Sequence, residues 1–453
     1  MLERCPSPIR RREFLQLGAL TVGGLSLRDL LAAREAAGTT KTDTSVILLY
    51  LHGGASQLET WDLKPDAPSS YRSVFRPIQT NIEGIDICEH FPRQAKIADK
   101  FSLIRTVHHD ASSHSDGGIV MLTGKRPTQF DPTSTSKSEH PDLGGVVSHA
   151  RGFGEAGIPP YVSIPRQPYM TRPTYLGGQH ASFDLGNIVA ENHETPHLKL
   201  TRGRDGAELL ERRTLIKQFD RWRRGLENDE SLRTTDKFQD LAIRMLTSAS
   251  TARAFDLEEE DEKLRDRYGR HLWGQGCLLA RRLAEAGTSV ISLFINTPKS
   301  GYEFTNWDDH PGNAGRPGHF GQFMEVRLPY LDEALSALIE DIYARQLDQK
   351  IMVLVMGEFG RTPRISARND AVGRDHWPQV ASVLVSGGGL RTGQAIGVTT
   401  PKAEYPIERP CTPQDLLATV YQHLGIDYHQ SLLDFAGRPV PILLSGEPIH
   451  ELL

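Results

Sequence analysis

Three runs of hydrophobic residues in this chain end on polar side chains. Residues 46–51 lead into His52, residues 101–107 into His108 and His109, and residues 351–356 into Glu358. Near-continuous apolar runs of this length are typical of strands that are buried on both faces. In open α/β sheets, ligands bind outside the carboxyl ends of such strands. The pattern therefore predicts a sheet with a functional edge, and it indicates which residues lie there.

Two further strands are predicted at residues 290–295 and 381–386. Helices are predicted near residues 327–347 and after Thr412, where Pro413 fits the first helical position and Gly425 the end. Strands that alternate with helices imply right-handed crossovers and parallel pairing. The fold class expected is α/β, a three-layer sandwich around a mostly parallel sheet.

Residues 205–286 differ in composition from their surroundings. They are rich in Arg, Glu, Asp and Leu, and apolar residues recur at helical spacing around positions 238–246 and 272–283. We expect a helical insert within the main domain. The acidic run at residues 258–262 is interpreted as a solvated helix face, with partner binding as the less favoured alternative.

The N-terminus has the pattern of an export signal. Arg11 and Arg12 precede Phe14 and Leu15, and a short apolar, glycine-rich stretch follows. This is the twin-arginine type, so we expect residues 1–37 to be the signal, residues 38–453 the α/β domain, and the twin-arginine machinery a partner. The expected location is the periplasm or cell envelope, and no other run approaches the length of a membrane span.

Composition narrows the function further. With 453 residues, 38% of them hydrophobic, the chain can bury a large core. The formal net charge is −5, and the predicted signal holds six arginines against four acids, so the rest is more negative still. That balance disfavours nucleic acid and anionic membranes as partners. The cysteines at positions 88, 277 and 411 are widely spaced and are interpreted as buried thiols.

Carboxylates and imidazoles lie next to each other on two predicted loops. Asp308 and His310 follow the strand at residues 290–295, and Asp375 and His376 follow the strand at residues 351–356. With Glu358 they form a plausible ligand set for a divalent metal such as zinc, manganese, calcium or iron. Such pairs also stabilise loops by hydrogen bonding, and this alternative stays open.

The segment 108–118 is rich in His, Ser and Asp and leads into a predicted helix start near Ser115. Exposed amides at Gly117 would favour an oxyanion, and His109 would line the same site. His114 is the candidate nucleophile or proton carrier, with Ser113 and Ser115 as neighbours. The alternative is a polar loop that caps a core helix.

Three more residues are candidates for substrate binding. His52 lies in a glycine turn after the first strand, and Glu59 follows soon after. Glycine permits close approach of a ligand, although a strand-to-loop turn also needs it for steric reasons. Arg361 offers a guanidinium fork to an anion, and a structural ion pair would explain it almost as well.

Taken together, these motifs resemble the domain-of-unknown-function 1501 family. The resemblance rests on Gly-Gly-x-Ser at position 53, Trp-Asp-x-Lys-Pro at 61, Trp-Asp-x-His at 307, Gly-Glu-Phe-Gly-Arg-Thr-Pro at 357 and Gly-Arg-Asp-His-Trp at 373, together with His114 ahead of Met-Leu-Thr-Gly. It covers the chain from Arg11 to about Asp427. The family is often labelled sulfatase-like and grouped with the alkaline-phosphatase superfamily, so the resemblance implies an alkaline-phosphatase-like fold.

The chain departs from the superfamily at two points. The stretch at residues 122–127 resembles the sulfatase Leu-Thr-Gly-x-x-Pro, but the nucleophile position that precedes it holds His114 instead of Cys or Ser. The usual Asp-Asn or Asp-His pair is Glu358-Phe359, which implies one metal, or none, in place of two. The function expected is a metal-dependent hydrolase of small-molecule or carbohydrate phosphate or sulfate esters; the alternative is a non-catalytic cell-envelope protein that binds polysaccharide or a protein partner.

Overall fold

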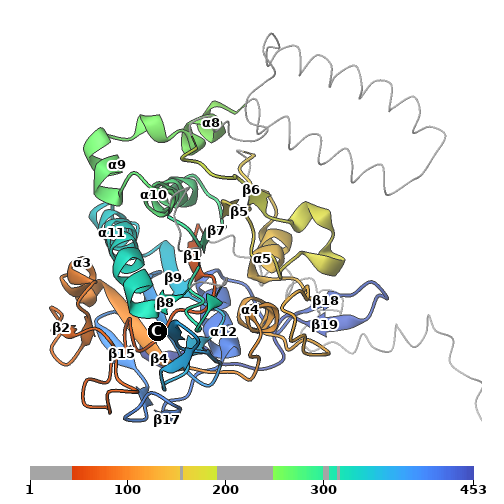
Figure 1. Ribbon diagram of the computed structural model, residues 1–453. Coiled ribbons are helices and arrows are strands. Elements are labelled where there is room, and N and C mark those ends of the chain that lie inside the picture. The colour runs from red at the N-terminus through yellow and green to blue at the C-terminus, as the bar shows by residue number, and fades with distance from the viewer. Residues whose placement is uncertain (1–42, 154–156, 191–247, 299–305, 314–316) are drawn as a thin grey trace, which may run out of the picture.

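A computed structural model describes residues 43–153, 157–190, 248–298, 306–313 and 317–453 (Figure 1). In these ranges the central sheet has eight strands in the order β15-β4-β14-β9-β1-β7-β5-β6. Their bounds are β1 (Ser45–Leu51), β4 (Phe101–Val107), β5 (Tyr161–Ile164), β6 (Phe183–Asp184), β7 (Val290–Ile295), β9 (Ile351–Met356), β14 (Ala381–Gly387) and β15 (Gln394–Ile396). The five longest predicted strands are therefore confirmed.

The sheet is parallel except for β14, which runs antiparallel to β9 and β4. This agrees with the mostly parallel sheet that we expected, and β14 is antiparallel because no helix separates it from β9. The chain leaves β9 at its carboxyl end, forms loops and short ribbons there, and returns directly into β14. This connection keeps residues 357–380 at the edge where β1, β4, β7 and β9 all end.

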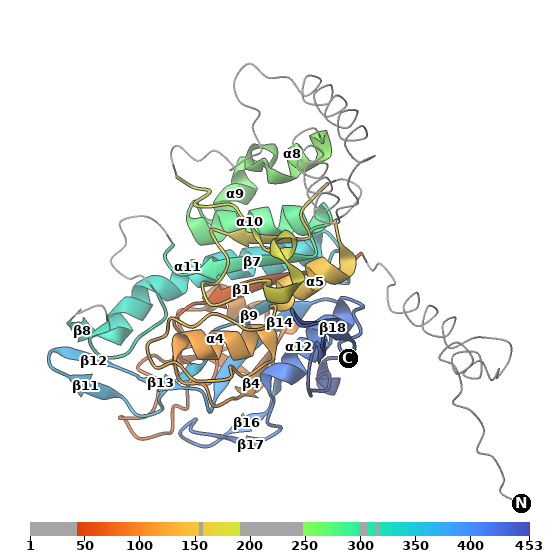
Figure 2. The ribbon, with the colours of Figure 1, turned by 90° about the vertical axis from the view of Figure 1, so that its right-hand side faces the viewer.

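Helices cover both faces of the sheet (Figure 2). On one side lie α3 (Pro92–Ala95), α8 (Ala249–Phe255), α9 (Glu262–Tyr268), α10 (Leu272–Glu285) and α11 (Phe320–Ala344); on the other lie α4 (His114–Thr123), α5 (Leu143–Arg151) and α12 (Pro413–His423). In β1, Ile47 and Leu49 pack toward the first group while Leu48 and Tyr50 pack toward the second. Strand alternation with apolar residues on both sides gives the three-layer α/β sandwich that the sequence predicted.

Short strands make ribbons around this core. They are β2 (Pro77–Gln79) with β3 (Asp86–Cys88), β10 (Gly360–Arg361) with β13 (His376–Trp377), β11 (Ser366–Arg368) with β12 (Ala371–Gly373) and β8 (Gly318–His319), β16 (Val398–Thr399) with β17 (Pro406–Glu408), and β18 (Ser431–Leu433) with β19 (Pro439–Pro441). Four of these strands, β10, β11, β12 and β13, belong to the loop between β9 and β14.

The start of α12 follows the predicted capping pattern. The Thr412 side chain accepts a hydrogen bond from the Asp415 amide, and the Asp415 carboxylate accepts one from the Thr412 amide. Pro413 occupies the first turn, where its missing N–H has no cost. The helix ends at His423, close to the predicted Gly425. None of the helices in the described ranges has the length and hydropathy needed to cross a membrane.

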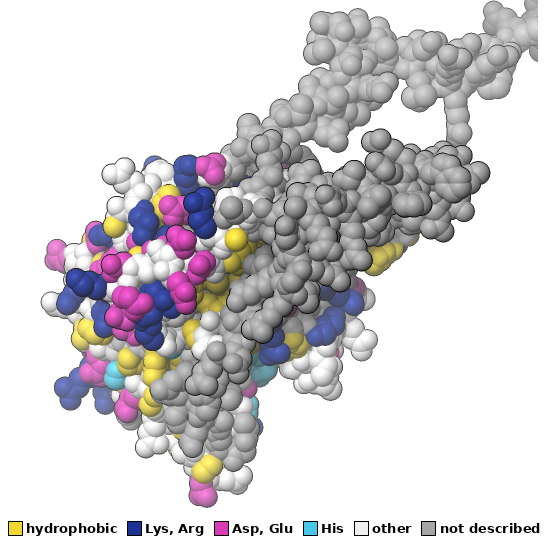
Figure 3. All heavy atoms as spheres, turned by 90° about the horizontal axis from the view of Figure 1, so that it is seen from above, with side chains coloured by type: hydrophobic (Ala, Val, Ile, Leu, Met, Phe, Trp, Pro, Cys, Tyr) yellow, Lys and Arg dark blue, Asp and Glu magenta, His cyan; other side chains and the backbone are white. Residues whose placement is uncertain are grey.

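The predicted signal and residues 205–247 of the predicted insert lie outside the described residues. The remainder of the insert is helical, and α10 packs against β7 and β1 in the main core. Acidic and basic side chains mingle on this face of the molecule (Figure 3), and Glu260 pairs with Arg281 while Glu262 pairs with Arg270. Cys88, Cys277 and Cys411 are free and buried, as expected.

Candidate metal centre

Three side chains from separate segments converge at the functional edge of the sheet. His114 is the first residue of α4, Asp308 lies in the loop that follows β7, and His376 is in β13. Each offers one ligand atom, and the three atoms lie within 4.8 Å of one another. His310 joins them from the Asp308 loop, with Nε2 3.1 Å from Asp308 Oδ2.

All three imidazoles are oriented in the same way. Each Nδ1 faces an acceptor: Glu358 Oε1 at 2.7 Å for His114, the Ser112 carbonyl at 2.7 Å for His376, and the Pro311 carbonyl at 3.2 Å for His310. Each Nε2 lies 3.1 Å from an oxygen of Asp308. This is the arrangement of metal-binding histidines, whose second nitrogen donates to a carbonyl or carboxylate.

Asp308 is held in place by its backbone and by Arg361. The loop enters beside β1, where the Trp307 amide donates to the His52 carbonyl at 2.8 Å. Gly53 makes this approach possible, because a Cβ there would lie 2.3 Å from the Asp308 nitrogen. The Arg361 guanidinium is 2.6 Å from Asp308 Oδ1 and fully buried.

Glu358 contacts the cluster through its hydrogen bond with His114. Its Oε1 accepts from the Gly53 amide at 2.8 Å as well as from His114, and His52 Nδ1 is 3.6 Å away. Among the described residues, Glu358 Oε2 and His52 Nδ1 are buried without a hydrogen bond. Buried polar atoms rarely stay unpaired, so a bound ion or ligand beside them would complete the site.

The electrostatics favour a charged cluster. Burial raises the pKa of Asp308, but Arg361 and the three imidazoles outweigh it and hold that pKa far below its usual range. Burial lowers the pKa of His114, and its hydrogen bonds to Asp308 and Glu358 overcome this and raise it to about 9. Burial also lowers the pKa of His376 and of His52.

The residues present fit a divalent transition metal. Two imidazole nitrogens and a carboxylate oxygen form a donor set that suits zinc, manganese or iron. With Nδ1 anchored, each Nε2 faces the cluster, where a bound metal would take the place of its proton. Of the three residues, Asp308 and His376 were predicted as metal ligands, and His114 was predicted as a catalytic residue.

Comparison with known proteins decides the family. The family model described as "Protein of unknown function (DUF1501)" matches residues 43–453. The chain belongs to this family. No curated protein sequence matches the chain.

Several solved structures are similar to this member of the DUF1501 family. A putative sulfatase from Bacteroides thetaiotaomicron has 9% identity and a TM-score of 0.40, covering 90% of this chain and 74% of its own. A lipoteichoic acid synthase from Listeria monocytogenes has 10% identity and a TM-score of 0.37, covering 91% and 76%. A phosphonate monoester hydrolase from Silicibacter pomeroyi has 11% identity and a TM-score of 0.35, covering 90% and 76%.

The predicted metal ligands of this DUF1501 chain divide into two groups. Asp308, His310 and His376 meet at the cluster, and Glu358 reaches it through His114. Asp375 lies apart, because its carboxylate is bonded to Ser366 at 3.0 Å and to Arg368 at 2.9 Å. Asp375 lies just before β13, and these contacts hold its side chain away from the cluster while His376 reaches it.

The residues predicted to act with His114 have local partners. Ser113 caps α4 by accepting from the Asp116 amide at 3.4 Å, and the Ser115 hydroxyl is buried without a partner among the described residues. The Gly117 amide donates to the Ser113 carbonyl at 2.8 Å. Gly117 lets α4 approach the site, since a Cβ there would lie 3.0 Å from the Phe359 ring.

The predicted substrate-binding residues also form internal contacts. Glu59 is fully buried and receives two hydrogen bonds from Arg374, at 2.9 and 3.0 Å. His109 accepts from the Ala111 amide through Nδ1 and donates through Nε2 to the Glu358 carbonyl at 2.7 Å. Burial lowers the pKa of His109 to about 4. The Arg361 guanidinium also donates to the carbonyls of Gly54, at 2.9 Å, and of Trp307, at 3.2 Å.

His52 is the predicted substrate-binding residue that borders the cluster most openly. Its ring stacks on Phe294 with centroids 4.7 Å apart and meets the edge of Tyr169 at 5.6 Å. The guanidinium carbon of Arg166 lies 5.2 Å from the centroid of the same Phe294 ring. Phe294, Tyr169 and Arg166 were not predicted, because a strand residue and two residues of a long polar loop carry no motif that points to a site.

Proposed function

We propose that this protein hydrolyses phosphate or sulfate esters with a divalent metal bound by His114, Asp308 and His376. The observation that supports this most directly is the convergence of their three ligand atoms within 4.8 Å. The cluster lies at the carboxyl edge of the sheet, where α/β enzymes of this type bind ligands. The motifs shared with the sulfatase-like group indicate the class of substrate, which is phosphate or sulfate esters, including those of carbohydrates.

Each residue has a distinct task in this proposal. The metal would supply Lewis acidity toward an ester oxygen and lower the pKa of a water molecule. Glu358 orients His114 through Nδ1, and Arg361 fixes the carboxylate of Asp308. His52 faces the cluster, with its ring centroid 5.9 Å from that of His114, and would transfer a proton to or from the substrate.

His114 is proposed as a ligand in this scheme, in place of the nucleophile considered at first. Its Nδ1 is occupied by Glu358 and its Nε2 faces Asp308, so neither nitrogen is available for attack on an ester. Export by the twin-arginine route to the periplasm or cell envelope is part of the proposal, since folded proteins with a loaded metal use that route. It rests on the sequence of the first 37 residues.

The experiment begins with metal analysis of the folded protein purified without chelator. We expect one transition metal per chain, lost in Asp308→Asn and His376→Ala and retained in Asp375→Asn, the matched carboxylate outside the cluster. The same variants are assayed with p-nitrophenyl phosphate and p-nitrophenyl sulfate. Turnover that follows the metal content supports the proposal, whereas full metal content in Asp308→Asn contradicts it.

The non-catalytic reading is favoured by one observation. Of the hydroxyls predicted to act with His114, that of Ser113 caps α4, and that of Ser115 is fully buried. A protein that binds one metal per chain yet turns over neither ester, and that binds sulfated glycans without releasing sulfate, would be a binding protein with the same centre.

A further inference from the structure

A second cavity lies on the opposite face of the ribbon that carries His376. Its volume is about 490 Å³, and its walls come from residues around Thr362 and Trp377 and from the turn before β17. Trp377 neighbours His376 in β13, and strand alternation sends the two side chains to opposite faces. The ribbon β10–β13 therefore separates this cavity from the metal cluster.

Aromatic rings form one side of the cavity. Trp377 and Tyr405 have ring centroids 5.7 Å apart, and Tyr71 completes the wall. Trp377 is fixed by a hydrogen bond from Nε1 to the Glu404 carbonyl at 2.7 Å, while Tyr405 is 50% exposed. Such a wall offers flat apolar faces whose edges are polar.

Two charged side chains border the cavity without partners. In the described part of the chain, neither the Arg364 guanidinium nor the Glu404 carboxylate makes a hydrogen bond or ion pair. Arg364 is exposed and Glu404 half-buried. The carboxylate of Asp375 also lines the cavity, where it is already paired with Ser366 and Arg368. The cavity therefore combines aromatic faces with one free donor group and one free acceptor group.

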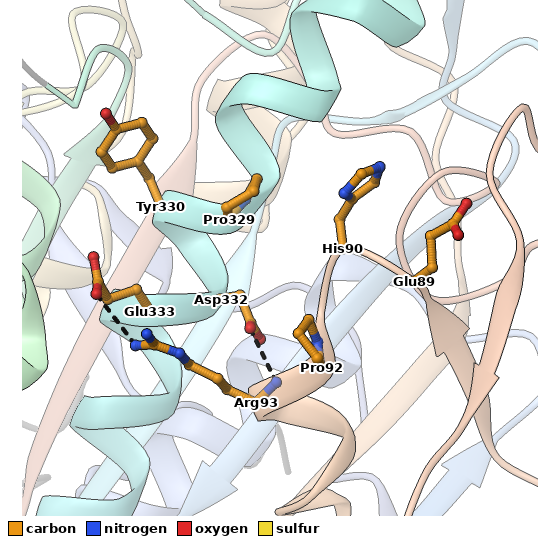
Figure 4. A pocket seen from close by; sticks show the side chains of 8 residues that line it. All are labelled: Glu89, His90, Pro92, Arg93, Pro329, Tyr330, Asp332 and Glu333. Carbon is orange, nitrogen blue, oxygen red and sulfur yellow. Dashed lines mark hydrogen bonds and ion pairs between the residues drawn. The ribbon is translucent and has the colours of Figure 1, made fainter.

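A third cavity shows why this combination is informative. It has a volume of about 340 Å³ and lies between the loop before α3 and α11 (Figure 4). Its acids already have internal partners: Asp332 accepts from the Arg93 amide at 3.0 Å, and Glu333 pairs with the Arg93 guanidinium at 3.2 Å. Among the described residues that line it, no acid and base are both without partners, whereas Arg364 and Glu404 are so in the cavity beside Trp377.

We infer that the cavity beside Trp377 binds an anionic saccharide. Sugar rings have apolar C–H faces that stack on aromatic side chains and hydroxyl edges that bond carboxylates, and Arg364 would pair with a sulfate or carboxylate on the sugar. The volume accommodates a short oligosaccharide. The site is a binding site only, so it does not depend on the proposed hydrolysis at the metal centre.

Isothermal titration calorimetry with a heparin-derived tetrasaccharide and neutral cellotetraose tests the inference. We expect the anionic sugar to bind about tenfold more tightly, one charged contact being worth about 1.4 kcal/mol. Arg364→Ala should remove the preference, and Tyr405→Ala should weaken both sugars about five- to tenfold. The matched controls, Arg391→Ala and Phe435→Ala at exposed positions elsewhere, should bind as the unchanged protein does.

Asp308→Asn separates this site from the metal centre. The variant, and the protein treated with a chelator, should retain saccharide binding even if hydrolysis and metal are lost. Loss of binding in Asp308→Asn would place the sugar at the metal centre and overturn the inference. Absence of heat with either sugar at millimolar concentration, or unchanged affinity in both Arg364→Ala and Tyr405→Ala, would overturn it as well.

Discussion

At the scale of residues, the centre is defined by which nitrogen of each histidine is already bonded. His114, His310 and His376 all direct Nδ1 to a carbonyl or carboxylate and Nε2 to Asp308. Three imidazoles and the Arg361 guanidinium surround the carboxylate of Asp308, two on each oxygen, which fills its capacity to accept hydrogen bonds. The common orientation is also the one that the proposed metal would require, because each Nε2 faces the same point.

Glu358 should control metal affinity through His114. Glu358→Gln keeps an oxygen acceptor for the Gly53 amide but removes the charge that makes His114 a stronger ligand, so we expect zinc affinity to fall about 10- to 100-fold. Competition with a chelating dye measures it. Glu404→Gln is the matched control, and equal zinc affinity in the two variants would contradict the orienting role.

We expect Glu59 to contribute to the stability of the folded protein. Its two hydrogen bonds with Arg374 are fully buried, and Arg374 also donates to the carbonyls of Tyr71 and Arg72, at 3.0 Å each. Glu59→Gln leaves the guanidinium charge uncompensated, and we expect the free energy of unfolding to fall by about 3–5 kcal/mol in urea titration.

The control for that variant is Arg368→Gln, which breaks the exposed pair with Asp375 and should cost no more than about 1 kcal/mol. If Glu59→Gln were as stable as this control and lost ester turnover instead, Glu59 would bind substrate, as the sequence had suggested.

At the scale of elements, the sequence identified the strands and the edge but could not place all the loops. Strands β1, β4, β7 and β9 are mostly apolar runs, and α12 begins with a clear cap, so both were predictable. The antiparallel β14 was not, because apolar runs do not encode direction. His376 lies in β13 and pairs with β10, whereas Asp375 precedes the strand and contacts Ser366 and Arg368, and no local pattern reveals these partners.

The turn after β1 should be as important as the ligands themselves. Gly53 has φ +115° and its missing Cβ makes room for the backbone of Trp307 and Asp308. In Gly53→Ala the loop must move, so we expect a loss of stability of about 2–4 kcal/mol and weaker metal binding.

Gly84→Ala provides the comparison for this turn. Gly84 also has positive φ, at +80°, but nothing lies within 4 Å of the added Cβ, so it should cost only about 1 kcal/mol through backbone strain. Urea unfolding and zinc titration on both variants separate strain from contact. Equal effects of the two substitutions would show that the approach of the Asp308 loop does not depend on Gly53.

At the scale of the whole molecule, the centre joins distant parts of the chain. His114 follows the β4 edge, Asp308 the β7 edge and His376 the β9 edge, so the ligands come together only when the sheet is complete. Membership of the DUF1501 family spans residues 43–453, which contain all of them. A centre built this way exists only in the folded state.

Metal binding should therefore stabilise the entire domain. A ligand that binds only the folded state adds RT ln(1 + [L]/Kd), which is about 2.7 kcal/mol when the free metal is 100 times Kd. We expect zinc to shift the urea midpoint of the metal-free protein and of Asp375→Asn by the same amount and to leave Asp308→Asn almost unchanged. Because the three proteins share the same other surface histidines, an equal shift in Asp308→Asn would mean that zinc binds elsewhere, and the cluster would then be a hydrogen-bonded network around Asp308.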